Sequence, residues 1–396
     1  MKIVIAGAGQ AAASLAAKLR ALGHDGPLTV IGDEPAAPYQ RPPLSKGYLL
    51  GQMPLDRLTL RAPDWWAEQG ITLRTGCPVT AIDPAARRLE TTAGAEDYDA
   101  LALTLGAAPR RLPAALGGDL PHVHVVRDLA DIDRLAPQLR PGRRLAVVGG
   151  GYIGLEAAAV ARTLGLEVTV IEAAPRILAR VASAEMAAQL RALHHRHGVA
   201  LREGAGVTAI SPQAVHLADG EAIPADLVIC GIGVAPRTAL AGAAGLALDN
   251  GIAVDACGRT SAPGIWAAGD CASFPMPDGT RLRLESVGNA IDMAEAVAAN
   301  MLGAAAPYVP APWFWSDQFD AKLQIAGLGT GADRTVLRPA DGGASVWSFA
   351  GPRLVCVEAL SDPRAYMVGK RLIDAGRSAD PAALADPATD LKTLMR

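Results

Sequence analysis

Residues 2–12 read KIVIAGAGQAA, and residues 144–154 repeat the same pattern as RLAVVGGGYIG. Each stretch is a short apolar run without helical periodicity, as expected of a buried parallel strand. Each then passes through a G-x-G-x-x-G/A turn into an Ala- and Leu-rich segment, which predicts helices ending near residues 22 and 164. Second strands follow at 28–31 and 167–171. The chain therefore carries one strand–helix–strand unit twice.

The glycine spacing in both copies is that of a dinucleotide-binding fingerprint. The first glycine allows a tight turn, the second lets a pyrophosphate approach the backbone, and the small third residue lets helix and strand pack closely. The helix start offers N–H groups and partial positive charge to the phosphates. One copy is weak evidence, but two copies in order predict two dinucleotide sites. The fingerprint residues are Gly7, Gly9 and Ala12 in the first copy, and Gly149, Gly151, Tyr152, Ile153 and Gly154 in the second.

Acidic residues close the second strand of each copy, where a carboxylate can accept hydrogen bonds from a ribose. They are Asp33 and Glu34 in the first copy and Glu172 in the second. Glu172 would repel the 2′-phosphate of NADPH, so this site is predicted to bind NADH. Arg176 and Arg180 lie downstream, and we interpret them as solvated or ion-paired arginines.

Length and composition narrow the function classes. The 396 residues predict two or three domains, and a net charge of -3 argues against a nucleic-acid partner. No apolar run reaches the ~18 residues of a membrane-spanning helix, and residue 2 leads directly into a strand, so we expect a cytoplasmic protein without a signal peptide. The five cysteines are widely spaced, which predicts neither a disulfide framework nor a zinc site but buried thiols in a reducing compartment.

Four further motifs carry a family resemblance. They are YQRPPLSK at 39–46, T-x4-IWAAGD at 260–270, ESVGNA at 285–290 and PWFWSDQ at 312–318. With the two fingerprints, they resemble the FAD-dependent, NADH-using ferredoxin reductases of bacterial oxygenase systems, in the same order and over nearly the whole chain. The proline–lysine and W-x-W-S-D-Q segments are specific to that group. The other motifs are shared by all glutathione-reductase-like flavoproteins.

The resemblance implies an α/β fold with two Rossmann-type domains, for FAD and NAD, and a small α+β C-terminal domain. The FAD domain would comprise 1–109 and 232–308, with the NADH domain, 110–231, inserted between them and the C-terminal domain at 309–396. Segments 106–110 and 231–237 contain glycine and proline after an apolar strand, as crossover segments should. The first crossover reads LTLG where the family usually has Ala-Thr-Gly, a departure that changes no expected cofactor contact.

The resemblance also implies roles for individual residues. Gly7, Gly9 and Ala11 would meet the FAD pyrophosphate, and Asp33 the adenosine ribose. Lys46 would lie beside the isoalloxazine ring and pair with Glu156, which makes these two the predicted catalytic residues. The other residues expected at FAD are Ala12, Glu34, Arg41, Val79, Arg127, Asp270, Val287 and Trp315, and Gly233 is expected at NAD.

Each of these side chains also has a plainer interpretation. A cation near the ring stabilises reduced flavin, but Lys46 could be a surface lysine and Glu156 a solvated helix-start glutamate. Tyr152 could cover the flavin until nicotinamide displaces it, or could simply pack. We expect Trp313 and Trp315 both to line the flavin edge and to contribute to the core of the small domain.

The chemistry expected belongs to the cofactors. NADH would give a hydride to FAD, which would pass single electrons to a [2Fe–2S] ferredoxin that feeds a cytochrome P450 or a ring-hydroxylating dioxygenase. Residues 39–52 lack cysteine and Cys77 lies too far along, which argues against disulfide reduction. No metal site is predicted, and we expect His194, His195 and His197 to be solvated.

The sequence is compatible with three functions. Besides a ferredoxin reductase, the chain could be a rubredoxin reductase or NADH oxidase of the same fold. It could also be an interaction protein of the apoptosis-inducing-factor type, regulated by NADH, although the basic patches or targeting segments expected of that group are not seen. Either a monomer or a weak homodimer is plausible.

Overall fold

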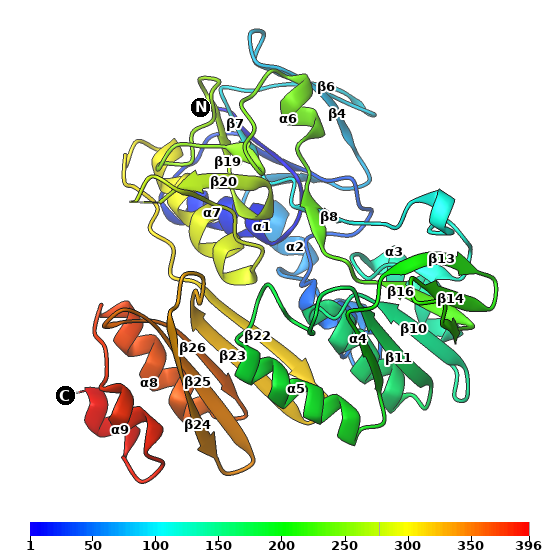
Figure 1. The fold of residues 1–396 in the computed structure, drawn as a ribbon. Helices are drawn as coiled ribbons and strands as arrows, with labels where there is room; N and C mark the ends of the chain where they lie inside the picture. Colours follow the sequence, from blue (N-terminus) through cyan, green and yellow to red (C-terminus); the bar gives the residue numbers. More distant parts are fainter. Residues whose placement is uncertain (277, 396) are drawn as a thin grey trace. The chain divides into compact units, whose positions relative to one another are not determined.

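The computed structural model describes residues 1–276 and 278–395, which form two compact units. The first unit comprises Met1–Arg41, Pro54–Ala108 and Val234–Pro312 and contains the first fingerprint. The second comprises Pro42–Met53, Pro109–Gly233 and the chain from Trp313 onward, and contains the second fingerprint. Figure 1 labels many of their helices and strands.

The first unit is built on a sheet of five parallel strands in the order β19-β7-β1-β2-β3. These strands are β1 (Ile3–Ala6), β2 (Leu28–Ile31), β3 (Ile71–Arg74), β7 (Ala100–Leu103) and β19 (Ile265–Ala267). β1, β2 and β7 are buried at every position, which explains their unbroken apolar sequences. Helices α1 (Gln10–Ala21) and α7 (Val287–Met301) lie side by side, α1 on β1 and β2 and α7 on β19 (Figure 1).

The second unit repeats this sheet with five parallel strands in the order β12-β11-β10-β16-β9. They are β9 (Val123–His124), β10 (Arg144–Val148), β11 (Glu167–Glu172), β12 (Ala200–Glu203) and β16 (Leu227–Cys230). Its helices are α3 (Leu129–Leu135), α4 (Tyr152–Thr163) and α5 (Ala184–Arg196). The predicted strands and helices of both fingerprints are confirmed.

The internal repeat extends beyond the fingerprints. In each unit a three-stranded antiparallel sheet follows the third parallel strand, with a register irregularity near the start of its first strand. The N–H of Gly76 donates to the Glu34 carbonyl just as Gly204 donates to Ala174, so these positions correspond. The strands are β4 (Val79–Asp83), β5 (Arg88–Thr91) and β6 (Gly94–Asp97) in the first unit, and β13 (Val207–Ser211), β14 (Ala214–Leu217) and β15 (Ala222–Pro224) in the second.

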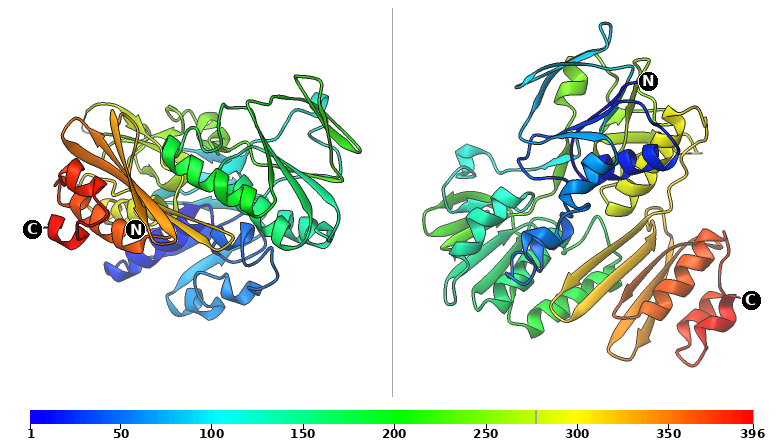
Figure 2. Two further views of the ribbon diagram at one scale, coloured as in Figure 1. Left: turned by 60° about the horizontal axis from the view of Figure 1, so that its bottom comes forward. Right: turned by 180° about the vertical axis from the view of Figure 1, so that it is seen from behind.

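The C-terminal part of the second unit is a five-stranded antiparallel sheet in the order β22-β23-β26-β25-β24. Its strands are β22 (Trp313–Gln318), β23 (Ala321–Gly327), β24 (Arg334–Ala340), β25 (Gly343–Ala350) and β26 (Arg353–Leu360). Helix α8 (Pro363–Asp374), orange-red in Figure 2, packs on β26 and β23 over a core that contains Trp347 and Phe349. The short α9 (Pro381–Ala385) follows.

Two of the points at which the chain crosses between the units follow Ala108 and Gly233. At these crossings β8 (Ala107–Pro109) and β17 (Val234–Pro236) pair in a two-stranded sheet. The division into four domain segments remains a prediction. It differs from the observed units in that the predicted NADH and C-terminal domains fall in one unit, and it also differs at 42–53. That segment, which begins with the 3-10 turn η1 (Pro42–Ser45), belongs to the second unit.

The remaining elements are short. The first unit also contains α2 (Pro63–Glu68), α6 (Ala239–Ala243), β18 (Ile252–Ala253), β20 (Ala272–Pro275), β21 (Arg281–Leu282) and the turns η2 (Leu55–Arg57) and η5 (Gly269–Cys271). The turns η3 (Ala114–Leu116), η4 (Ala136–Gln138) and η6 (Leu391–Met395) belong to the second unit. None of the helices within the described ranges has the length and apolar character needed to cross a membrane.

Candidate functional site

The first fingerprint forms an open backbone cradle. Gly7 has φ of 108°, and a Cβ there would come within 2.3 Å of the Thr104 carbonyl oxygen, so only glycine fits the turn. A Cβ on Gly9, in contrast, would meet nothing within 4 Å. Helix α1 begins after Gly9 without a side-chain cap, which leaves its first N–H groups to an external acceptor. The residues therefore fit the pyrophosphate of a dinucleotide.

The second fingerprint repeats this geometry. Gly149 also has φ of 108°, and a Cβ on it would come within 2.4 Å of the Gly231 carbonyl oxygen. The space at Gly151 is open to 4 Å, and α4 begins there without a side-chain cap. A Cβ on Gly154 would lie 2.1 Å from the Gly149 carbonyl oxygen, so this third glycine brings the helix against the strand. A second pyrophosphate fits here.

The acidic residues after the second strands are not equivalent in the two units. The Glu172 carboxylate accepts hydrogen bonds of 2.7 Å from the N–H groups of both Gly150 and Ala174, which fixes its position beside the fingerprint. The corresponding residue of the first unit is Gly32, because the N–H of Gly7 donates to Ile31 as that of Gly149 donates to Ile171. Asp33 and Glu34 therefore lie one and two residues farther along.

Both acids of the first unit have basic partners. Asp33 forms a 2.6 Å ion pair with Arg237, which lowers its pKa although partial burial opposes the shift. Glu34 pairs with Arg41 and accepts a 2.5 Å hydrogen bond from the Tyr39 hydroxyl. Contacts of Asp33 or Glu34 with a ribose stay predictions.

Two arginines near the second fingerprint behave differently. Arg176 donates to the backbone carbonyls of Ile177, Ala179 and Ala182, so its guanidinium is occupied by its own loop. Arg180 is exposed, and one of its Nη atoms lies 3.4 Å from where a Cβ of Gly233 would be. We expected Arg176 to be solvated or ion-paired, whereas its guanidinium binds backbone carbonyl groups instead.

Three elements of the first unit meet at the start of α1. Gly269 in η5 has φ of 78°, and a Cβ there would come within 3.1 Å of the Ala11 side chain and 3.9 Å of Ala290 in α7. This close approach places Asp270 next to the fingerprint helix. The partly buried Val287 opens α7 directly after its cap, Ser286. The predicted FAD residues Ala11, Asp270 and Val287 thus belong to neighbouring elements.

The predicted pair of Lys46 and Glu156 forms. The Lys46 Nζ lies 2.8 Å from the Glu156 Oε2, and the two side chains are 18% and 2% exposed. Burial raises the pKa of the Glu156 carboxyl, while Lys46 and the hydroxyls of Ser316 and Ser45 oppose that rise. Interpretation of these two residues as a surface lysine and a solvated glutamate is excluded.

Two partners of this pair, Ser45 and Ser316, were missed from the sequence, as was a third residue, Gln318, that binds Ser316. The hydroxyls of Ser45 and Ser316 each donate to Glu156 at 2.6 Å, and Gln318 donates to Ser316 at 3.0 Å. Ser316 and Gln318 are buried and lie two residues apart, on one face of β22. Polar residues at that spacing in a strand were the available signal, since they mark a face that must find internal partners.

The expectation that the three histidines are solvated is wrong for His194. Its side chain is fully buried, one ring nitrogen lies 2.8 Å from Gln318 Oε1, and burial lowers its pKa to about 4. Helix α5 starts at Ala184, and over its full length His194 continues the buried stripe that includes Leu190. His195 is exposed, as expected, and the half-buried His197 stacks on Phe319 at 3.9 Å.

The aromatic side chains are packed but incompletely buried. The Tyr152 ring lies 4.5 Å from that of Phe314, and its hydroxyl donates to the Val181 carbonyl at 3.1 Å. Trp313 and Trp315 stack on each other at 5.5 Å, half-buried and outside the C-terminal core cluster. These two tryptophans were expected to form part of the core of the small domain, but neither belongs to the C-terminal core cluster. Any contact of Tyr152 or Trp315 with flavin stays a prediction.

The last two predicted FAD residues have less distinctive surroundings. Val79 opens β4 and is partly buried. Arg127, also partly buried, lies between β9 and α3 in the second unit.

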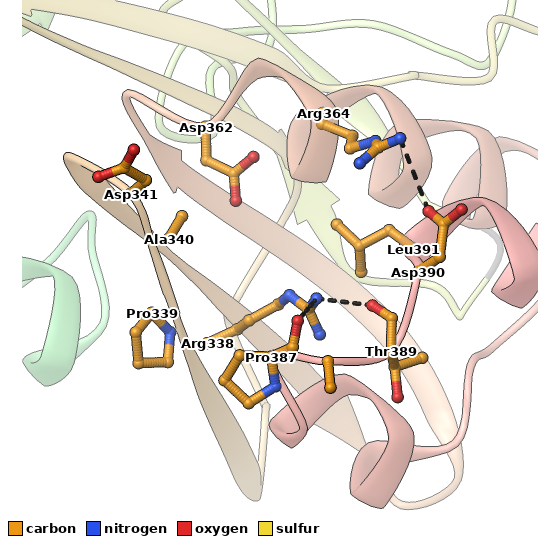
Figure 3. Close-up of a pocket in the computed structure, with 11 residues that line it drawn as sticks. Arg338, Pro339, Ala340, Asp341, Asp362, Arg364, Pro387, Thr389, Asp390 and Leu391 are labelled. Carbon is orange, nitrogen blue, oxygen red and sulfur yellow. Dashed lines mark hydrogen bonds and ion pairs between the residues drawn. The ribbon is translucent and has the colours of Figure 1, made fainter.

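A cavity of about 590 Å³ opens in the C-terminal part of the second unit (Figure 3). Arg338 lies at its floor, where its guanidinium donates to four backbone carbonyls, those of Leu384, Asp386, Pro387 and Thr389. None of the predicted site residues lines it. Its arginine serves to hold the C-terminal segment and offers no evident binding function.

No group of His, Cys, Asp and Glu side chains among residues 1–276 and 278–395 has the arrangement of a metal site. All five cysteines are free thiols, and four of them are buried. Burial raises the pKa of Cys271 to about 11, which keeps its thiol protonated and poorly reactive.

Comparisons with known proteins cover the whole chain. Residues 1–294 match the family model described as pyridine nucleotide-disulphide oxidoreductase, and residues 313–395 match the one described as reductase C-terminal. Rhodocoxin reductase of Rhodococcus erythropolis is 43% identical over 99% of this chain and 94% of its own length. The ferredoxin–NAD(+) reductase component of the anthranilate 1,2-dioxygenase system of Burkholderia cepacia is 41% identical over 99% of this chain and 98% of its own. The reductase in the crystal structure of the covalent putidaredoxin reductase–putidaredoxin complex superimposes with a TM-score of 0.95 at 39% identity, covering 100% of this chain and 98% of that one.

Proposed function

This chain belongs to the pyridine nucleotide-disulphide oxidoreductase family, and we propose from this that it is an NADH-dependent ferredoxin reductase. Its fold is the glutathione-reductase-like one predicted from the sequence, followed by the small C-terminal domain of the reductases. The observation that carries the proposal is the presence of two open glycine cradles, at Gly9 and Gly151, in one chain. One cradle suits FAD and the other NADH.

The bound cofactors supply the redox chemistry, which is hydride transfer from NADH to FAD and single-electron transfer to a [2Fe–2S] ferredoxin. The chain's own residues bind and orient them. We propose that Gly7, Gly9 and the start of α1 hold the FAD pyrophosphate, with Asp270 and Val287 contributing from η5 and α7. Lys46 would face the flavin, with its charge balanced by Glu156.

NADH is favoured over NADPH by the environment of Glu172. Two backbone N–H groups fix the position of its carboxylate, at the place where the 2′-phosphate of NADPH would lie. Arg176 cannot readily neutralise that phosphate because its guanidinium already donates to three carbonyls. A strong preference for NADH follows.

Electron transfer through a protein disulfide is disfavoured despite the family's name. Residues 39–52 contain no cysteine, and Cys77, the next along the chain, is a buried free thiol. A route by single electrons to an external iron–sulfur protein requires no thiol. The relatives named for a dioxygenase system and for putidaredoxin favour a ferredoxin that serves a ring-hydroxylating dioxygenase or a cytochrome P450.

Location and assembly are part of the same proposal. Five free thiols suit a reducing compartment, and we propose that the protein acts in the cytoplasm as a monomer or weak homodimer.

The test is a reconstituted electron-transfer assay. The purified protein should be yellow, and NADH should bleach it much faster than NADPH does. It should reduce cytochrome c only after a [2Fe–2S] ferredoxin is added. Equal turnover without any iron–sulfur protein would favour an NADH oxidase, and faster turnover with rubredoxin would favour a rubredoxin reductase. Slow reduction combined with tight protein binding would favour the interaction protein.

A further inference from the structure

The carboxylate of Glu156 is held on both of its oxygens. Oε2 accepts from the Lys46 Nζ at 2.8 Å and from the Ser45 hydroxyl at 2.6 Å. Oε1 accepts from the Ser316 hydroxyl at 2.6 Å. The first two donors come from 42–53, and the third comes from β22 on the other side of the carboxylate. A group that is only 2% exposed thus has three donors and no need of water.

Behind Ser316 the hydrogen bonds continue. Gln318 Nε2 donates to the Ser316 hydroxyl oxygen at 3.0 Å, and Gln318 Oε1 lies 2.8 Å from the His194 Nε2. Ser316, Gln318 and His194 are all buried, at 0%, 1% and 0% exposure. A line of four side chains therefore runs from helix α5 through β22 to Glu156 in α4.

The donor and acceptor groups allow only one direction of hydrogen bonding along this line of side chains. An ionised carboxylate can only accept, so the hydroxyl hydrogen of Ser316 must point to Glu156. The Ser316 oxygen then accepts from the amide nitrogen of Gln318, the one donor to it among the residues that the structure describes. The amide oxygen therefore faces His194, which must carry its proton on Nε2. All three hydrogen bonds point toward the carboxylate, and hydrogen bonds aligned in this way strengthen one another.

We propose that Ser316 and Gln318, with His194 behind them, are positioning residues that keep Glu156 ionised and oriented toward Lys46. This inference rests on the proposed function in one respect, because it takes Lys46 to be the residue beside the flavin. It also gives the Ser-Asp-Gln segment of the sequence a role. Trp313, Trp315 and Asp317 alternate with Ser316 and Gln318 along β22, so the two polar side chains share the face turned to α4.

The consequence concerns the charge offered to the flavin. With Glu156 ionised, the ammonium of Lys46 is balanced by a carboxylate 2.8 Å away. With Glu156 neutral, the positive charge is unbalanced and favours the reduced, anionic flavin, which raises the midpoint potential. Burial already raises the pKa of Glu156, so the loss of one donor brings protonation closer to neutral pH. The other titratable groups around it are Tyr152 on its own helix and, beyond Tyr152, Glu358 and Cys356 of β26.

The experiment is a measurement of the flavin midpoint potential against pH in the holoenzyme. Glu156→Gln should raise the potential at every pH. Ser316→Ala and Gln318→Met should follow the wild type in alkaline solution and move toward the Glu156→Gln value as the pH falls. An infrared band of a protonated carboxyl should accompany that shift and be absent when Ser316→Ala is combined with Glu156→Gln. Ser316→Thr keeps a hydroxyl and should restore the wild-type curve.

Ser348→Ala is the matched control, since Ser348 is buried in β25 of the same unit and lies outside the line. It should leave the potential unchanged at every pH. If Ser316→Ala and Gln318→Met follow the wild-type curve throughout while Glu156→Gln does not, the inference is overturned. If Glu156→Gln also leaves the potential unchanged, Lys46 does not lie beside the flavin and the inference fails. Bound FAD and its reduction by NADH would still support the proposed function in that case.

A measurement on the unmutated protein covers the case in which a variant fails to fold. The nitrogen chemical shifts of the His194 ring, assigned by through-bond correlations in the unmutated protein, should report a neutral ring with its proton on Nε2. A proton on Nδ1 would reverse the direction of the line and overturn the inference.

Discussion

Glu172 and Gly32 occupy equivalent positions in the two Rossmann sheets. Each directly follows the isoleucine whose carbonyl accepts a hydrogen bond from the first glycine of its fingerprint. A side chain at this place therefore exists only in the second unit, where the carboxylate is fixed by the N–H groups of Gly150 and Ala174. A Cβ on Gly32 would come within 2.4 Å of the Ala8 side chain, so the first unit leaves no room for an acid there.

Replacement of Glu172 by Gln should weaken the discrimination between NADH and NADPH. The neutral amide keeps the size of the side chain but no longer repels a 2′-phosphate, so kcat/KM for NADPH should rise by about tenfold, or ~1.4 kcal/mol. That for NADH should fall severalfold because a charged acceptor is lost. Steady-state kinetics with both nucleotides measure this, and Glu167→Gln, at the exposed start of the same strand, is the control. An unchanged ratio of the two kcat/KM values would show that Glu172 does not meet the ribose.

The two cradles can be closed separately by a single methyl group. Gly151→Ala should abolish most NADH binding, because its Cβ would point into open space where the pyrophosphate must approach. The backbone at Gly151 has φ of -80°, which alanine adopts without strain, so the melting temperature should stay within a few degrees of the wild type. Nucleotide titration and thermal unfolding measure the two effects.

Gly9→Ala is the matched change in the first unit, where the space is equally open and φ is -102°. It should lower the FAD content of the purified protein while the second cradle remains intact. Normal NADH affinity in Gly151→Ala, or full FAD content in Gly9→Ala, would contradict the assignment of the corresponding cradle.

The fingerprints predicted the fold well because steric contacts at the turn allow only glycine at certain positions, and the spacing of these glycines is visible in the sequence. The positive φ of Gly7 and the 2.3 Å approach to the Thr104 carbonyl leave one residue type only. The burial of His194 could have been predicted from the apolar stripe of the complete helix. The expectation of solvated histidines considered only the last turns of that helix. In the line from His194 to Glu156, His194 is separated from Gln318 by 124 positions in the sequence, and Ser316 is separated from Glu156 by 160. No local sequence pattern can predict contacts between residues so far apart.

Removal of Lys46 should expose the cost of burying Glu156. Lys46→Met leaves a carboxylate that is 2% exposed without its counter-ion, which should destabilise the protein by about 2–4 kcal/mol at neutral pH. Adding Glu156→Gln should recover most of that loss, because no buried charge remains. Denaturant unfolding measures the free energies, and Lys370→Met is the control, since Lys370 pairs with Asp374 at the surface of α8 and should cost under ~0.5 kcal/mol.

The pH dependence of Lys46→Met has a defined sign. Without its counter-ion, Glu156 holds a proton more tightly in the folded than in the unfolded chain, so the folded state gains stability as the pH falls through the raised pKa. The difference from the wild type should therefore shrink between neutral pH and about pH 5. A difference that stays constant over this range would mean that Glu156 is not the origin of the loss.

The buried His194 should make stability sensitive to mild acid. Its pKa is lowered from 6.5 to about 4 by burial, so below pH 6.5 the unfolded chain takes up a proton that the folded chain refuses. The contribution is fully present above pH 6.5 and is lost as the pH falls toward 4, by about 2 kcal/mol at pH 5. Glu156 and Glu358 act in the opposite direction, since burial raises their pKa values.

The effect of His194 can be isolated by comparing unfolding free energies at neutral pH and pH 5. His194→Leu removes the titrating ring, so although the variant loses a hydrogen bond at every pH, its stability should fall less on acidification than that of the wild type. His195→Leu alters the exposed neighbour on the same helix and should keep the wild-type dependence. Equal losses in wild type and His194→Leu would mean that His194 is protonated in the folded protein. A charged ring could still donate to Gln318, but it would have to hold its second proton on a nitrogen that has no acceptor among the described residues.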